Sequence, residues 1–101
     1  MEDRSLYNGL IRLHILHHAA EGDVFGQWMI DELNRHGYRL SAGTLYPILH
    51  GMERQGYLRS RLAADRGRNR RVYRATAAGR KALVTARRRV KELFGEMLEH
   101  D

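Results

Sequence analysis

With 101 residues, of which 43% are hydrophobic and 30% charged, the chain has the size and balance of a single globular domain. The absence of cysteine excludes a disulfide framework, thiolate zinc sites and cysteine nucleophiles, and no apolar run approaches the roughly 20 residues that span a bilayer. The net charge of +6 is concentrated in residues 59–91, which hold eleven Arg, two Lys and one acid, so the expected partner is a polyanion such as nucleic acid.

The first two helices are predicted from the spacing of apolar residues. Residues 5–20 form an amphipathic helix whose apolar positions recur at three- and four-residue steps: Leu6, Leu10, Leu13, Leu16 and Ala20. Asp23 is the expected N-cap of the second helix, and Gly37 lies where a left-handed residue would end it. The apolar positions of this second helix are Gly26, Met29, Ile30 and Leu33.

The third helix contains a proline that bears on where it begins. Its apolar stripe consists of Leu45, Ile48, Leu49 and Met52. Gly56 follows its last turn. Ser41 and Thr44 are both suitable N-caps, but Pro47 would lie in the helix interior if Ser41 were the cap. Because a proline costs least in the first turn, we expect a loose or bent first turn around Thr44.

An arginine-rich β-hairpin and a long helix are predicted after Gly56. Polar and apolar residues alternate over residues 57–62 and 71–74, and residues 65–69, Asp-Arg-Gly-Arg-Asn, are typical of a turn. Thr76 can cap a last helix that runs to about residue 98. The predicted fold class is therefore mainly α with a small β-hairpin (α+β), in one compact unit.

The second and third helices, with their short connection, are typical of a helix-turn-helix, in which the later helix enters the major groove of DNA. Opposite its apolar stripe the third helix carries small or polar groups that can approach phosphates and base edges: Thr44, Tyr46, Pro47, His50, Gly51 and Arg54. An ordinary amphipathic helix with a solvent-exposed face is the competing interpretation of this segment taken alone.

Four arginines lie within six residues at the predicted hairpin tip: Arg66, Arg68, Arg70 and Arg71. Like charges this close repel each other, so an external anion is expected to neutralise them. A basic hairpin beside a recognition helix suits a DNA duplex, with Arg66 or Arg68 in a narrow minor groove. For Arg59, Arg61 and Arg74 on the hairpin's stem, pairing with acids or solvation is as good an interpretation as DNA contact.

The last helix carries an apolar seam that is longer than one small core can cover. The seam consists of Leu83, Ala86, Val90, Leu93, Phe94 and Met97. Packing within the same chain is one interpretation, but a seam left exposed on a monomer would favour unspecific association. We expect the seam to form a homodimer instead, because a two-fold protein matches a palindromic DNA site.

Two motifs carry a family resemblance, together with Gly26. Residues 40–58 contain Gly43-Thr44-Leu45-Tyr46-Pro47, and residues 70–80 end in Thr76-Ala77-Ala78-Gly79-Arg80. Over roughly residues 9–83 the chain resembles the PadR family of winged helix-turn-helix transcriptional regulators, and the Gly-Thr-Leu-Tyr-Pro motif is the most specific part of the match.

The resemblance implies a homodimeric repressor that binds double-stranded DNA. It implies a winged helix-turn-helix domain over residues 1–76 and a dimerisation helix over residues 77–101. The third helix and the β-hairpin, which is the wing of this fold, would lie on a palindromic operator. Ser41, Thr44, Tyr46, His50 and the four arginines at the tip of the wing would face the DNA. The interface residues would be Leu83, Val90, Leu93, Phe94 and Met97.

Trp28 departs from the family pattern, because relatives often carry Gly-Tyr-Glu where this chain has Gly26-Gln27-Trp28. Some relatives bind flat aromatic compounds between subunits, so the resemblance implies a small aromatic or hydrophobic effector as a candidate partner. Trp28 could border that pocket, cover the dimer interface or pack against the final helix, and the last of these is the plainest interpretation.

The first helix places His14 and His18 on one face, one turn apart, and two such imidazoles can bind a metal ion. Further ligands from the last helix would be Glu96, Glu99 or His100. The competing interpretations are ordinary surface histidines and a pH-sensitive surface.

Catalysis is not expected, and neither is a cofactor. The chain has no phosphate-binding glycine loop, no His-Glu-x-x-His motif and no Ser-His-Asp grouping. Its acidic start, Met1-Glu2-Asp3, is unlike a signal peptide, so we expect a soluble cytoplasmic protein without membrane contact. The sequence predicts a DNA-binding repressor released by a small molecule. The alternatives are a metal-responsive regulator and a protein-interaction module on the same scaffold.

Overall fold

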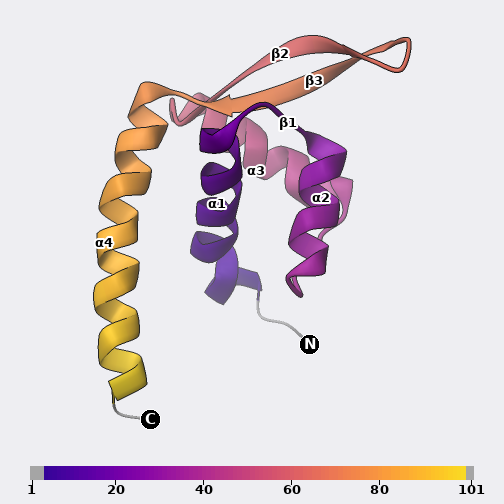
Figure 1. Ribbon diagram of the computed structural model, residues 1–101. Coiled ribbons are helices and arrows are strands. Elements are labelled where there is room, and N and C mark those ends of the chain that lie inside the picture. Colours follow the sequence, from indigo (N-terminus) through magenta and orange to yellow (C-terminus); the bar gives the residue numbers. More distant parts are fainter. Residues whose placement is uncertain (1–3, 100–101) are drawn as a thin grey trace.

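The computed structural model describes residues 4–99, which fold into helices and one antiparallel sheet (Figure 1). In chain order the elements are α1 (Arg4–Glu21), β1 (Val24–Phe25), α2 (Gly26–Arg35), α3 (Ala42–Arg54), β2 (Leu58–Asp65), β3 (Arg68–Ala75) and α4 (Ala77–Glu99). The predicted α+β class and the order of its main elements are confirmed, and the two-residue strand β1 is an addition.

The core lies between the sheet and the first three helices, which hang beneath the sheet in Figure 1. β3 is the central strand, with β1 and β2 on either side. Side chains with no exposed surface come from each of these helices: Ile15, Met29, Leu33, Leu45 and Leu49. Burying one such side chain stabilises a fold by about 1.5–3 kcal/mol. Because all three helices contribute side chains to the same core, this burial fixes their positions relative to one another.

α1 has two apolar faces where the sequence predicted one. The predicted stripe put Leu6 and Leu10 in the core, but they are 68% and 41% exposed. The face that is buried consists of Ile11, Ile15, Leu16 and Ala19. Spacing alone cannot choose between two apolar faces of one helix, and the unburied face, with Leu10 and Leu13, looks toward α4.

The segment between α1 and α2 also differs from the prediction. Asp23 is not an N-cap, because β1 intervenes and Phe25 holds the cap position. Val24 and Phe25 pair with β3, which ties the start of α2 to the sheet. The Asp23 carboxylate instead forms ion pairs with Arg61 of β2 and Arg74 of β3.

A glycine and an asparagine fix the turn between α2 and α3. Gly37 has a φ of +96°, as predicted for a left-handed residue. The Tyr38 N–H donates to the Leu33 carbonyl at 3.1 Å, which completes a Schellman helix end. The Asn34 side chain accepts from the Leu40 N–H at 2.9 Å and donates to the Leu40 carbonyl at 3.3 Å. These bonds hold the angle of the helix-turn-helix.

α3 begins three residues earlier than predicted. Ser41 is its N-cap residue, and the Ser41 carbonyl accepts from the N–H groups of Thr44 and Leu45 at 3.1 and 2.9 Å. Pro47 therefore lies inside the helix and leaves the Gly43 carbonyl without its usual donor. The predicted first turn around Thr44 was wrong, because burial of Leu45 holds the earlier turn against the core and outweighs one lost bond.

β2 and β3 form the predicted hairpin, which projects beyond the helices in Figure 1. The strands are paired over their full length and are joined by Arg66 and Gly67 alone. These two residues have φ values of +52° and +81°, the positive pair that a type I′ turn requires. The turn therefore puts an arginine at the extreme end of the hairpin.

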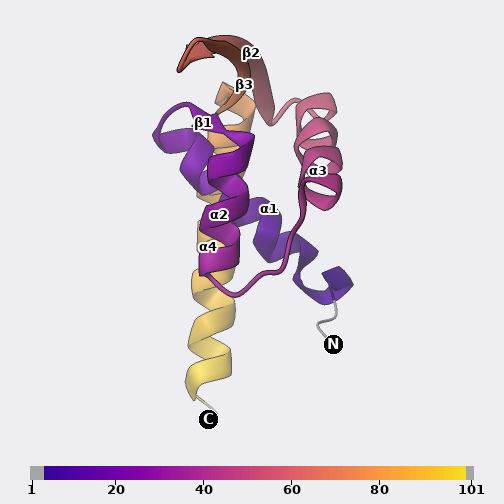
Figure 2. The same ribbon diagram turned by 90° about the vertical axis from the view of Figure 1, so that its right-hand side faces the viewer.

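α4 is anchored by its first turns and then extends past the other helices (Figure 2). Its predicted N-cap is confirmed, because the Gly79 N–H donates to Thr76 Oγ1 at 3.0 Å. Gly79 lies so close to the Tyr57 carbonyl that a Cβ there would come within 2.2 Å of the oxygen. Leu83 is the last buried side chain of the helix, and residues 91–99 are all exposed.

Candidate nucleic-acid interface

The exposed face of α3 is made of positions at three- and four-residue spacing: Gly43, Pro47, His50 and Arg54. Glycine and proline carry no long side chain, so the helix backbone can come close to a ligand there. His50 and Arg54 supply polar groups that can bond to phosphates or base edges. The predicted residues Pro47, His50 and Arg54 thus lie on one solvent-facing strip, while Gly51 and Thr44 flank it half-buried.

The remaining two predicted residues, Ser41 and Tyr46, lie at the start of α3. Ser41 is exposed, and its hydroxyl lies 3.4 Å from Thr44 Oγ1. Tyr46 is turned inward instead, where it packs against the core. A Cβ on Gly26 would come within 2.3 Å of the Tyr46 hydroxyl, so the glycine permits this close approach of α2 to α3. The geometry makes Tyr46 a positioning residue beside His50, whose ring centre lies 6.3 Å away.

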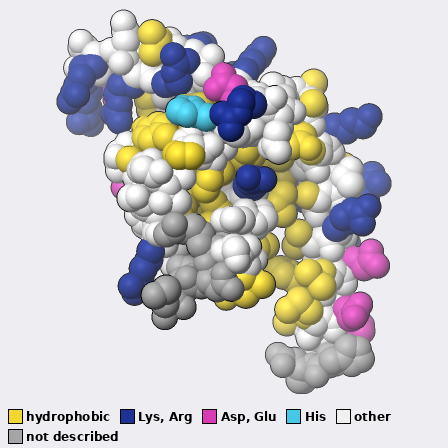
Figure 3. Space-filling view, turned by 180° about the vertical axis from the view of Figure 1, so that it is seen from behind, with side chains coloured by type: hydrophobic (Ala, Val, Ile, Leu, Met, Phe, Trp, Pro, Cys, Tyr) yellow, Lys and Arg dark blue, Asp and Glu magenta, His cyan; other side chains and the backbone are white. Residues whose placement is uncertain are grey.

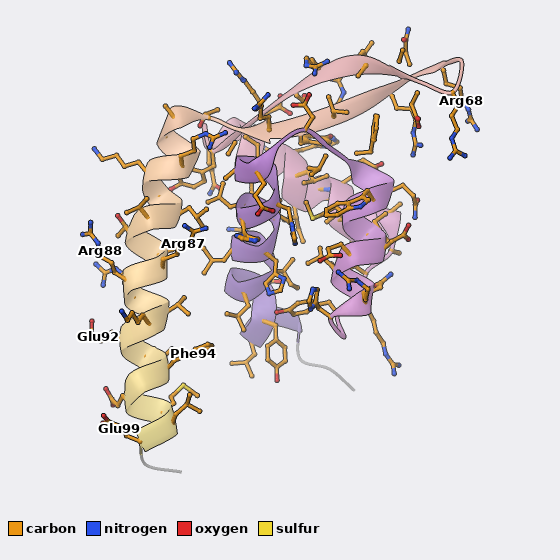
Figure 4. The ribbon with its side chains drawn as sticks, in the orientation of Figure 1. Arg68, Arg87, Arg88, Glu92, Phe94 and Glu99 are labelled. Carbon is orange, nitrogen blue, oxygen red and sulfur yellow. The ribbon has the colours of Figure 1, made fainter. Side chains whose placement is uncertain are left out.

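Two of the four tip arginines extend freely from the hairpin. Arg66 and Arg68 are exposed, and among the described residues neither has a hydrogen-bond or ion-pair partner. Figure 4 shows Arg68 reaching away from the tip. Figure 3, which views the α3 side, shows Lys and Arg side chains gathered over this end of the hairpin. The tip therefore offers concentrated, uncompensated positive charge.

Arg70 is held within the hairpin rather than presented by it. Its Nη1 donates to Asp65 Oδ2 at 2.7 Å, and its guanidinium lies 5.3 Å from the centre of the Phe25 ring. A cation above an aromatic face is attracted to it, so both contacts restrain the side chain. Arg70 thus braces the outer half of the wing against β1, and its predicted contact with DNA stays a prediction.

Arg71 is also engaged, through a relay that reaches α3. Its Nη1 donates to Ser60 Oγ at 2.9 Å, and the Ser60 hydroxyl donates to Glu53 Oε2 at 2.8 Å. Because Glu53 belongs to α3, the relay fixes the stem of the wing relative to that helix. Arg71 therefore acts on the position of the wing as well as on its charge.

Sequence reasoning missed the residues that position this interface. They are Asp23, Asn34, Glu53 and Ser60. The signal available for Asp23 was its charge, since an acid is the natural partner for stem arginines such as Arg61 and Arg74. Asn34 gave no signal, because its partner Leu40 lies across a turn whose shape was not known in advance.

The apolar seam of α4 divides into a buried and an exposed part. Leu83 is 6% exposed and belongs to the protein's own core, so it is already covered within this chain, and its place in a dimer interface stays a prediction. Val90 is half-buried. Leu93, Phe94 and Met97 are 53%, 52% and 59% exposed. Internal packing thus accounts for the first turns of α4 and not for its outer half.

A groove of about 690 Å³ lies between α1 and this part of α4. Its apolar lining includes Leu10, Leu13, Ala86, Val90 and Phe94. Its polar lining consists of His14, His17, His18, His36, Arg87 and Lys91. In Figure 4 Phe94 and Arg87 point toward α1, whereas Arg88, Glu92 and Glu99 point away from it. α4 therefore turns its apolar residues, together with Arg87 and Lys91, into the groove, and Arg88, Glu92 and Glu99 outward.

The residues predicted for effector and metal binding lie around the same helix, α1. Trp28 is 45% exposed and packs edge-on against His18, with ring centres 5.1 Å apart, rather than against the final helix as expected. His14 lies against the rings of His36 and Tyr38, and burial, together with the nearby His36, lowers the pKa of His14.

The acids proposed as extra metal ligands do not line the groove that contains these histidines. Glu96 and Glu99 line a polar hollow along α4 with neighbouring charged side chains of the same helix. Figure 4 shows that Glu99 points away from α1. His100 lies outside the described residues. Any further ligand for a metal bound by these histidines would therefore come from α1 or α2.

A helix-turn-helix followed by a two-stranded hairpin, with free arginines at the tip, defines the winged-helix class of DNA-binding proteins. The model of the Transcriptional regulator PadR-like family matches residues 15–85. This chain belongs to the PadR family, and it is a transcriptional regulator rather than an enzyme. No helix among residues 4–99 has the length and apolar character needed to cross a membrane.

Relatives support the same assignment in sequence and in structure. The chain is 55% identical over 95 residues to Transcriptional regulator Rv3488 of Mycobacterium tuberculosis (strain ATCC 25618 / H37Rv), with 94% of this chain and 89% of the relative covered. A PadR family transcriptional regulator from Eggerthella lenta DSM 2243 is 28% identical, with a TM-score of 0.78 and coverage of 96% and 88%. A PadR-like regulator from Bacillus cereus strain ATCC 14579 is 26% identical, with a TM-score of 0.76 and coverage of 95% and 91%.

Proposed function

We propose that this protein is a homodimeric repressor that binds palindromic operator DNA and is released by a small hydrophobic or aromatic molecule. The observation that carries the DNA contact is the free pair of arginines, Arg66 and Arg68, on a hairpin that projects beside the exposed face of α3. α3 enters the major groove, and the tip follows the backbone into the adjacent minor groove.

The contacts divide into those that position the protein and those that read sequence. Arg66 and Arg68 neutralise phosphates or enter a narrow minor groove, which raises affinity for all duplex DNA. His50, Arg54 and Thr44 on α3 face base edges and set the preference among sequences. The positive end of the α3 dipole, at Ser41, adds a favourable site for a phosphate.

The outer half of α4 supports the homodimer. Leu93, Phe94 and Met97 leave a wide apolar strip exposed, and the groove beside it has a matching apolar lining. A monomer gains by covering such a surface, at about 25 cal/mol per Å² of apolar area. A second copy that lays its own α4 into this groove covers both strips at once and gives the two-fold symmetry of a palindromic site.

The same groove supports release by a small molecule. Its volume and apolar lining suit a drug-sized ligand, and it lies between the DNA-binding body and the helix proposed for dimerisation. A ligand that prefers one angle between α1 and α4 shifts the spacing of the two reading helices, and only such a preference can alter DNA affinity. Trp28 lies nearby on α2, against His18 of the groove wall.

The experiment that tests DNA recognition is selection of bound sequences from random duplex DNA by the purified full chain. We expect an enriched palindrome whose half-sites are about one helical turn apart, or a multiple of it. An unenriched pool would contradict the proposal and favour a protein-interaction module. A non-palindromic site would contradict the two-fold arrangement alone.

Release is tested with the selected operator. Small aromatic and hydrophobic compounds are added to the complex, and the fraction of bound DNA is measured by fluorescence anisotropy. A releasing compound should lose its effect in Leu13→Arg, which adds a charge to the α1 wall of the groove outside the predicted interface residues, and analytical ultracentrifugation should show that this variant still associates like the native chain. Release that is unchanged in Leu13→Arg would place the effector elsewhere.

A further inference from the structure

Three candidate metal ligands meet at the C-terminal turn of α1. His17 Nε2 lies 3.8 Å from Glu21 Oε1, and His18 Nδ1 lies 3.6 Å from the same oxygen. Ligand atoms of the three residues all lie within 4.8 Å of one another, and residues 4–99 contain no other grouping of this kind. Bonds of about 2.0–2.2 Å place tetrahedral zinc ligands roughly 3.3 Å apart, so small side-chain rotations complete the site.

We propose that His17, His18 and Glu21 bind a divalent ion of the zinc class. Two imidazoles and one carboxylate are a donor set that zinc accepts, with water in the fourth position. The hard ions Mg²⁺ and Ca²⁺ prefer all-oxygen sites and are not expected to compete. The site shares His18 with the histidine pair predicted from the sequence. His17 and Glu21, in the last turn of α1, take the place of His14.

A buried carboxylate supports His18 from the other side. His18 Nε2 lies 3.3 Å from Glu32 Oε2, so a metal on Nδ1 leaves the Nε2–H to donate to Glu32. The Glu32 side chain is 9% exposed and accepts from Arg35 at 2.5 Å and lies 3.0 Å from His36 Nε2. A carboxylate in this place fixes the imidazole's tautomer and orientation, as outer partners of metal-binding histidines do.

The site also touches α4. Arg87 Nη2 lies 3.4 Å from His17 Nδ1. A metal on His17 Nε2 puts the ring proton on Nδ1, which then has no lone pair to accept from Arg87. The ion's charge repels the guanidinium as well. Metal binding therefore removes one contact between α1 and α4. Any effect of this on DNA binding rests on the proposed function, whereas the binding itself does not.

Trp28 provides a reporter for the site. Its ring centre lies 5.1 Å from that of His18, and it is the only tryptophan in the chain. A metal ion on His18 changes the charge and polarity beside the indole, so tryptophan emission should follow occupancy. The signal is specific, because the exposed His50 lies on α3 and gives no ring contact to Trp28.

The test is a titration of the tag-free full chain with ZnCl₂, followed by calorimetry and by tryptophan emission. We expect one zinc ion per chain and an emission change that saturates at the same ratio. His17→Ala, His18→Ala and Glu21→Gln should each weaken binding at least tenfold. The matched controls, His14→Ala and His50→Ala, should stay within about twofold of the native affinity.

Two further variants separate ligation from loss of structure. Arg87→Ala should tighten zinc binding severalfold, because it removes a competing positive charge without removing a ligand. Glu32→Gln keeps the shape of the side chain and should weaken binding by about 10–100-fold if it is the outer partner of His18. Thermal unfolding of each variant without metal shows whether the fold is intact.

The proposal is overturned if zinc fails to bind more tightly than millimolar, or if His18→Ala binds as well as the native chain. It is also overturned if His50→Ala weakens binding as much as His17→Ala. Because imidazole binds a metal only in its deprotonated form, acid should compete with zinc and weaken its binding. Affinity that is independent of pH between 5.5 and 7.5 would exclude histidine ligands.

Discussion

α3 and the outer half of α4 are both amphipathic, but the apolar stripe of α3 is buried and that of α4 is exposed. Leu45 and Leu49 of α3 have no exposed surface, whereas Leu93 and Phe94 of α4 are about half exposed. The reading face is thus held by the protein's own core and by relays such as Arg71–Ser60–Glu53. The end of α4 has no comparable support within the described chain, so a partner surface is expected to supply it.

The largest difference in stability should appear when a leucine is replaced by alanine in each of the two regions. Leu49→Ala leaves a cavity in the core and should lower the free energy of unfolding by about 2–5 kcal/mol. Leu93→Ala should change it by less than about 0.5 kcal/mol at low protein concentration and should matter only where the chain associates. Urea unfolding at several protein concentrations measures both. Equal costs at high dilution would erase the difference between the regions.

The joint between the two regions is Gly79. A Cβ at this position would meet the Tyr57 carbonyl at 2.2 Å and Leu16 at 3.1 Å, so Gly79→Ala should cost about 1–3 kcal/mol as backbone shifts. Gly95→Ala on the same helix is the control, since nothing lies within 4 Å and the helix gains up to about 1 kcal/mol. Thermal melts compare the two, and a Gly79→Ala protein as stable as Gly95→Ala would mean that α4 is not clamped there.

A charge placed on the apolar strip should test the dimer. Phe94→Glu puts a carboxylate into the proposed interface and should shift the protein to monomer at micromolar concentration. Val84→Glu is matched in exposure, at 49% against 52%, but lies about a quarter turn from the groove-facing strip, so it should leave the association unchanged. Analytical ultracentrifugation distinguishes the outcomes, and a dimer that survives Phe94→Glu removes the strip from the interface.

The wing should respond to loss of its two free arginines. The double variant Arg66→Ala/Arg68→Ala should weaken binding to all duplex DNA and reduce the slope of log affinity against log salt by about two. The double variant Arg88→Ala/Arg89→Ala removes equal charge from α4 and should leave the slope unchanged within error. If both pairs lower the slope equally, the positive charge acts as a diffuse field and not through the tip.

The smallest effect should come from the buried hydroxyl of Tyr73, which has no hydrogen-bond partner among the described residues. Tyr73→Phe should change stability at pH 7 by less than about 1 kcal/mol. Burial raises the pKa of Tyr73 above 10.0, so the native fold favours the neutral phenol and loses that contribution as the pH rises past 10. Between pH 9 and 11 the free energy of unfolding should fall more steeply for the native chain than for Tyr73→Phe.

Much of the fold could be predicted because its signals are local. Gly37 and Gly67 have positive φ values where glycines stood at predicted turns, and Thr76 caps α4 as its position suggested. The start of α3 could not be predicted, because the cost of Pro47 within a helix is visible in the sequence while the burial of Leu45 that outweighs it is not.

The residues of the candidate site could be predicted from the sequence, but their contacts within the chain could not. Arginine clustering indicated the wing tip, but it could not tell Arg66 and Arg68, which are free, from Arg70, which lies over Phe25. That distinction depends on β1, a strand too short to give a pattern. Tyr46 was likewise assigned to the surface, since spacing cannot reveal that Gly26 leaves room for its ring.

Sequence alone determined the order of the main elements, the basic hairpin, the turn glycines and the family, because these follow from short-range spacing and residue type. Tertiary structure decided which face of α1 is buried, which arginines stay free, and that His17, His18 and Glu21 stand beside a buried Glu32. Those outcomes depend on contacts between residues far apart in the chain, where packing and desolvation choose among arrangements that local patterns leave equal.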